Sequence, residues 1–115
     1  MNGRDELLIK EIVKYAEEIR ITIENNGLTA ASLRENFVWK NSISMDILQI
    51  GELVGKLSDE LKQLHAEVPW RPIKAMRNIA AHHYGSFDIE ILWETATEDI
   101  PQFEAFCRDL ISNDQ

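Results

Sequence analysis

The side chains best suited to catalysis are concentrated in residues 77–84, which read RNIAAHHY. The planar guanidinium of arginine donates two parallel hydrogen bonds to a phosphate. Histidine has an unperturbed pKa of ~6.5 and therefore exchanges a proton near neutrality. With no cysteine in this segment and no compact carboxylate cluster, Arg77 and His82 suit metal-free cleavage of RNA. The histidine would deprotonate a ribose 2′-OH while the arginine stabilises charge at phosphorus.

The same residues also permit structural interpretations. A lone arginine such as Arg77 is commonly a partner in a surface salt bridge, and a histidine such as His82 or His83 often caps a helix end. Tyr84 precedes a glycine, and a tyrosine there often packs its ring while its hydroxyl reaches solvent. Two alternatives to an enzyme follow: a non-catalytic module that binds a nucleotide or docks a protein partner, and a purely structural dimeric bundle.

The spacing of the motif constrains how it would act. Five residues along an ideal helix correspond to a rotation of about 500°, which places Arg77 and His82 about 140° apart. Asn78 lies four residues before His82 and shares its face. One straight helix would not easily bring Arg77 and His82 to one phosphate. Two copies facing each other across a two-fold axis would, so we predict a homodimer.

The charge distribution singles out the same segment. The formal net charge is −8, which argues against charge-driven coating of nucleic acid. No acidic residue occurs between Glu67 and Asp88, however, while five basic or imidazole side chains do: Arg71, Lys74, Arg77, His82 and His83. A local basic site within an acidic protein is therefore predicted.

The elements that must position this site are helical. Three apolar stripes recur every three or four residues. They comprise Leu8, Ile12, Tyr15, Ile19 and Ile23; then Ile43, Ile47, Ile50, Val54 and Leu57; and finally Ile89, Trp93, Ala96, Ile100, Phe103, Cys107 and Leu110. No alternating run rich in Val, Ile or Thr competes as a strand. The pattern predicts an all-α antiparallel bundle of four long helices plus one short helix.

Local signals suggest where these helices begin and end. Gly27 stops the first helix, and the pair Ser32 and Glu35 suggests a capping box. Ser58 suggests the start of the short helix, which would end near Glu67. Pro69 and Pro72 suit the first turn of the motif helix. Pro101 lies inside the last stripe, where we expect a kink or a break.

The second stripe has two glycines beside it. Gly51 and Gly55 each follow a stripe position by one residue. Glycine lowers helix propensity, so its presence here suggests a close approach between two helices. Trp39, Trp70 and Trp93 are expected to be packing residues, and His65 carries no motif around it.

Length and composition predict one domain over residues 1–115. The single cysteine, Cys107, excludes an intrachain disulfide and a CxxC-type zinc site, and its place on an apolar stripe predicts burial. We expect no metal and no other cofactor. No apolar run approaches the ~20 residues of a membrane span, and no signal peptide is evident at the N-terminus. A cytoplasmic location is expected.

The motif resembles a known signature. Arg77, His82 and Tyr84 match the R-x4-H-x-Y pattern of the HEPN ribonuclease toxins, in particular the HepT-like family. Several separated segments extend the resemblance: QIGE at 49–52, VPWR at 68–71, MRN at 76–78, ILWE at 91–94 and EDIP at 98–101. The first helix matches only in its pattern.

This resemblance implies an activity and a partner. It implies a metal-independent endoribonuclease, the toxin of a type VII-like toxin–antitoxin pair, whose two motifs share a cleft in a homodimer. Arg77 and His82 become the catalytic pair, with Asn78 in support. The implied partner is a small nucleotidyltransferase that transfers AMP from ATP to Tyr84 and so blocks RNA binding. No family role transfers to His83. Because the chain is acidic, we expect low affinity for bulk RNA and a salt-sensitive rate.

Overall fold

The computed structural model describes residues 1–82 and 89–113, with the backbone alone at 78–82. The helices in these ranges are α1 (Gly3–Asn25), α2 (Ala30–Glu35), α3 (Phe37–Lys56), α4 (Asp59–Leu64), α5 (Trp70–His82), α6 (Ile89–Glu94) and α7 (Ile100–Asn113), with a π-helical turn at Thr95–Asp99. The described part contains no strand. The all-α prediction is therefore confirmed, with more short helices than the single one expected.

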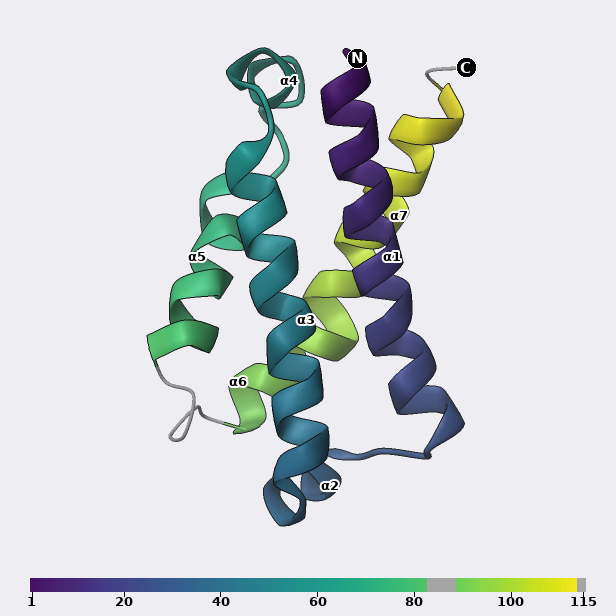
Figure 1. The fold of residues 1–115 in the computed structure, drawn as a ribbon, viewed down its shortest axis with the longest axis vertical. Coiled ribbons are helices and arrows are strands. Elements are labelled where there is room, and N and C mark those ends of the chain that lie inside the picture. Colours follow the sequence, from purple (N-terminus) through teal and green to yellow (C-terminus); the bar gives the residue numbers. More distant parts are fainter. Residues whose placement is uncertain (83–88, 114–115) are drawn as a thin grey trace.

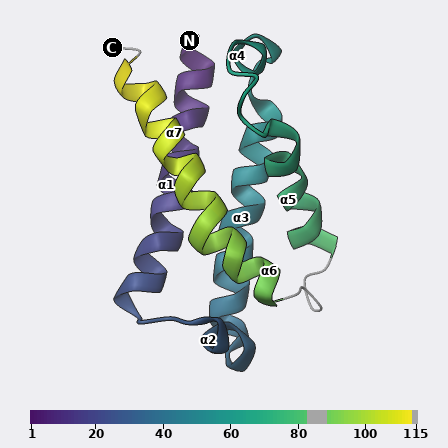
Figure 2. The same cartoon turned by 180° about the vertical axis from the view of Figure 1, so that it is seen from behind.

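The long helices alternate in direction. In Figure 1, α1 and α5 run downward while α3 and the α6–α7 segment run upward. Helix α3 packs against both α1 and α5, and α7 packs against α1. Figure 2 shows α7 crossing the bundle on the opposite side. Helix α3 is therefore the main neighbour of the motif helix α5 and packs it against the rest of the core.

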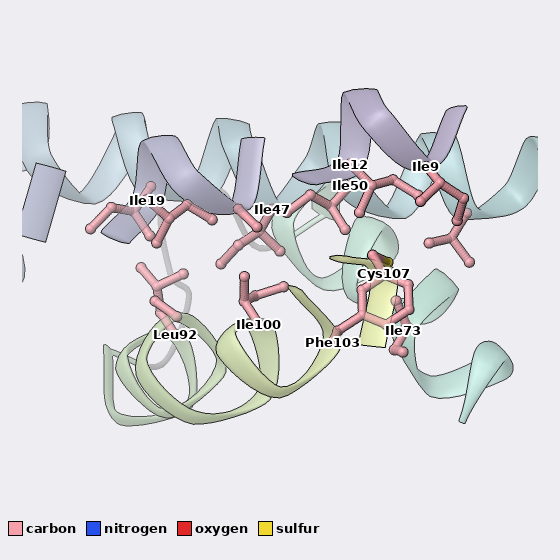
Figure 3. Close-up of a cluster of buried hydrophobic side chains, with 14 of the residues drawn as sticks. Ile9, Ile12, Ile19, Ile47, Ile50, Ile73, Leu92, Ile100, Phe103 and Cys107 are labelled. Carbon is pink, nitrogen blue, oxygen red and sulfur yellow. The ribbon is translucent and has the colours of Figure 1, made fainter. Parts of the chain in front are cut away.

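The apolar stripes form one core (Figure 3). All five residues of the second stripe are buried, as predicted; four lie on α3 and the fifth, Leu57, is its C-cap. On α1 the fully buried positions are Ile9, Ile12, Ala16 and Ile19, so Leu8, Tyr15 and Ile23 lie at the edge of the core. On the last helical segment Leu92 rather than Trp93 is fully buried. On α1, which packs against both α3 and α7, the buried arc is wider than a single stripe.

Several local signals are confirmed and one is corrected. Gly27 has a φ of 56°, the left-handed conformation that closes α1. Helix α2 begins after Thr29, whose backbone N–H donates to the hydroxyl of Ser32 at 3.0 Å. Ser32 is therefore the last residue of the capping box, at position N3, and not its first, so the expected pairing with Glu35 is wrong.

The start of α4 is joined to α1. Ser58 caps α4 by accepting a hydrogen bond from the Leu61 N–H, as the sequence indicates. Asp5, only 2% exposed, accepts hydrogen bonds from both the backbone N–H and the hydroxyl of Ser58. The helix ends at Leu64, one turn earlier than expected. This bonding satisfies a buried carboxylate and fixes the end of the bundle from which α5 departs.

The chain does not break at Pro101. A π-helical turn at Thr95–Asp99 leads directly into α7, and the Ile100 N–H bonds to the carbonyl of Thr95, five residues back. A proline lacks the N–H that would continue the α-helical pattern, and a π turn shifts the hydrogen-bond register just before it. Of the two alternatives expected there, a kink or a break, the break is wrong, because the helix continues through this wider turn. Within the described helices, none is both long and apolar enough to cross a membrane.

Candidate ribonuclease site

The backbone of the motif lies on one continuous helix. Helix α5 includes Arg77, Asn78 and His82 without interruption, so the rotation of about 140° between the first and the last follows from helix geometry. The side chains of Asn78 and His82 and all of His83 and Tyr84 lie outside the described residues. The contacts predicted for these four residues stay predictions.

The start of the motif helix is anchored by Trp70. Its indole N–H donates to the carbonyl of His65 at 2.9 Å, and its ring meets those of Phe103 and Phe106 edge-on. His65 also contacts Phe106 and lies 3.6 Å from a carboxylate oxygen of Glu67. These aromatic contacts attach the first turn of α5 to α7, which confirms a packing role for Trp70.

Two glycines on α3 set the distance to α5. A Cβ atom at position 51 would lie 2.6 Å from the Cβ of Arg77 and 3.0 Å from its backbone nitrogen. At position 55 the nearest atom would be the side-chain Cε of Lys74, at 3.4 Å. Of these two positions, Gly51 is therefore where α5 comes closer to the α3 backbone, and Arg77 is the residue opposite it. The predicted close approach is confirmed, with Gly51 as its tightest point.

Arg77 forms an ion pair across this contact. Its Nε atom donates to the Oε1 atom of Glu52, the residue that follows Gly51. Both side chains are 43% exposed. The role of Glu52 was not predicted from the residues, because its pairing depends on two helices meeting. The adjacent glycine was the one local signal, since it marks where another helix must lie.

The described part of the α5 surface carries several basic side chains. Arg71 and Lys74 precede Arg77 at intervals of three residues, and both are exposed. Successive steps of three rotate by about −60°, so the three cations form a ridge that turns around one side of α5. Such a ridge attracts a phosphate backbone locally even in an acidic protein.

A pocket on another side of α5 is mostly apolar. It has a volume of about 370 Å³ between α5 and α7, and its walls are mostly apolar: Val68, Pro69, Pro72, Ile73, Met76, Phe103 and Phe106. Glu67, Asp99 and Gln102 complete it. Among the lining residues that the structure describes, the charged groups are both carboxylates, which repel phosphate. The pocket is therefore not the site at which RNA would be held.

Two further titratable groups lie away from the motif. Burial and the neighbouring Glu18 carboxylate raise the pKa of Asp46 to about 7. Asp46 precedes Gly51 by five residues on α3, so it faces α1, about 140° from the α5 contact. Burial, with the Glu104 carboxylate nearby, raises the pKa of Cys107 to about 12. The thiol is therefore not a nucleophile near neutrality, which agrees with its predicted place in the core.

Comparison with known proteins identifies a matching family profile and similar relatives. The family profile described as "Ribonuclease HepT-like" matches residues 9–110. The chain is similar to "Probable ribonuclease HepT" of Thermococcus cleftensis, with 32% identity over 95 residues, which cover 78% of this chain and 86% of the relative. It is also similar to "Putative RNase TTE0752" of Caldanaerobacter subterraneus subsp. tengcongensis, with 33% identity over 57% of this chain and 59% of the relative. No solved structure matches significantly.

Proposed function

Because this chain belongs to the HepT-like ribonuclease family, we propose that it is a metal-independent endoribonuclease and the toxin of a type VII-like toxin–antitoxin pair. The match over residues 9–110 carries this proposal. It includes all of α5, where Arg77 is placed against α3 by Gly51 and paired with Glu52. Such a toxin acts on cellular RNA, so its location would be the cytoplasm.

The proposed reaction is an intramolecular transesterification. His82 accepts the proton of a ribose 2′-OH while the 2′-oxygen forms a bond to the adjacent phosphorus. The bond from phosphorus to the 5′-oxygen breaks, and that oxygen takes a proton from water or from a second, protonated histidine. Arg77 donates hydrogen bonds to the phosphoryl oxygens as negative charge builds up on them. Asn78, next to Arg77 on α5, would support the phosphate as an additional donor.

The site is proposed to be composite. Arg77 and His82 lie on one uninterrupted helix, at an angular separation of about 140°. A phosphate that contacts Arg77 of one protomer is reached more easily by His82 of a second protomer across a two-fold axis. The working enzyme would then be a homodimer with two motifs in a shared cleft.

Cleavage without metal tests the proposal directly. We expect the purified dimer to cut a defined RNA in excess EDTA at the rate seen without the chelator, because protein side chains supply both the base and the charge stabilisation. Product ends should carry a cyclic phosphate and a 5′-hydroxyl. Absence of cleavage by protein whose intact mass shows no modification would contradict the proposal and favour the non-catalytic binding module.

Control of the toxin by its partner leads to a separate prediction at Tyr84. We propose that a nucleotidyltransferase antitoxin transfers AMP from ATP to the Tyr84 hydroxyl, with release of pyrophosphate. Co-expression should then raise the intact mass by about 329 Da per AMP, and cleavage should fall because an added anion repels the RNA phosphate. Tyr84→Phe should abolish the mass shift.

The chain contains its own control for this experiment. Tyr15, the only other tyrosine, is a partly buried residue on α1. The Tyr15→Phe variant should be modified as fully as the parent. A mass shift that survives in Tyr84→Phe would reject Tyr84 as the target.

A further inference from the structure

The ion pair between Arg77 and Glu52 leaves one edge of the guanidinium available. Arginine has five N–H donors, one on Nε and four on the two terminal nitrogens. Glu52 accepts from Nε, and the part of the chain that the structure describes shows no other ion pair or hydrogen bond of this side chain. The edge formed by the two terminal nitrogens can therefore make parallel hydrogen bonds to two phosphate oxygens. We propose that Glu52 is a positioning residue, which holds Arg77 so that this edge faces the scissile phosphate. The inference rests on the proposed catalytic role of Arg77.

Stability alone does not account for Glu52. Both side chains of the pair are 43% exposed, and ion pairs in such surroundings contribute little to folding because water screens them. The contact of α3 with α5 is already formed by the backbone at Gly51. What the pair adds is a fixed direction for a long side chain that would otherwise sample many rotamers.

Glu52 also carries a cost for substrate binding. A carboxylate beside the phosphate site repels RNA, and the chain has a net charge of −8 already. A residue that only weakened RNA binding would be disadvantageous there. A residue that orients Arg77 instead stabilises the transition state, in which the negative charge on the phosphoryl group is greatest. Orientation and repulsion therefore predict opposite effects on kcat and on binding when Glu52 is replaced.

Steady-state kinetics on RNA separate these effects. We expect Glu52→Ala to lower kcat about tenfold, because a misdirected catalytic group loses rate steeply, while KM stays constant or falls as a repulsive charge is removed. Glu52→Gln retains a carbonyl that accepts from Nε and should keep an intermediate kcat. Glu52→Asp keeps the charge but is one methylene shorter, so its kcat should fall below that of Glu52→Gln.

A charge-matched control and a melting curve complete the test. Glu11→Gln, at an exposed position of α1, removes one negative charge far along the sequence from the motif and should leave kcat unchanged. Melting temperatures of all the variants should stay near that of the parent. A Glu52→Ala variant with the parent's kcat, whatever its KM or melting temperature, would overturn the positioning role.

The Arg77→Ala variant separates this inference from the proposed function. Loss of cleavage in Arg77→Ala together with full kcat in Glu52→Ala would overturn the positioning role alone. An inactive parent, or an Arg77→Ala variant as active as the parent, would overturn both.

Discussion

Replacing His82 with alanine should slow RNA cleavage by about 10²–10⁴-fold, because a positioned general base contributes this much to rate. Arg77→Ala should cost about 10²–10³-fold through lost stabilisation of the charged phosphoryl group. Growth inhibition in cells should disappear with either change. Initial rates on a defined RNA in EDTA, measured beside the melting temperature of each variant, provide the comparison.

The control for His82 is another histidine of the same chain. His65 is half-buried against Phe106 at the end of α4, and His65→Ala should lose some stability but keep its rate per folded molecule. A well-folded His82→Ala variant with undiminished cleavage would exclude the catalytic role. If both motif variants instead melt early or dissociate, with no specific effect on RNA, the structural alternative is correct.

Mixing the two inactive variants tests whether the site is composite. In a dimer of one Arg77→Ala protomer with one His82→Ala protomer, one shared site lacks both groups and the other has both. A site built across the two-fold axis therefore recovers part of the parent's activity after exchange of subunits. A site built within each protomer recovers none, because every site then lacks one group.

The sequence predicted the framework better than the site. The stripe on α3 could be predicted position by position because this helix has an apolar arc that points into the core along its length. The exact buried positions on α1 and the register of the last helix could not, since neighbouring helices decide how wide an arc is covered. The π turn before Pro101 was likewise beyond prediction, because a proline signals a disturbance but not whether the helix breaks or widens.

In the candidate site, too, residues marked by local spacing could be predicted, whereas contacts between distant parts of the sequence could not. Arg77 could be identified by its type and by its spacing from His82. Its partner Glu52 lies 25 residues earlier, on another helix, and no periodicity joins them. Gly51 was recognisable as a place of close approach, but only the packed structure shows that Arg77 is the residue approached.

Gly51→Ala is therefore expected to have a large effect on both fold and activity. The added methyl group would overlap the Cβ and backbone nitrogen of Arg77, and neither atom can move without shifting α5. Overpacking of this kind costs about 1–3 kcal/mol, which exceeds the gain of up to about 1 kcal/mol from replacing a helical glycine. Denaturant unfolding should show a net loss, and RNA cleavage should fall because Arg77 is displaced.

Gly55→Ala is the matched control, one turn further along the same helix face. Its added methyl group meets only the flexible end of the Lys74 side chain, at 3.4 Å, so the gain in helix propensity should prevail and the free energy of unfolding should stay equal or rise. Cleavage should be retained, since Arg77 does not move. Equal stability and equal activity in the two alanine variants would show that α5 can shift freely, and would remove the structural reason for a glycine beside the motif.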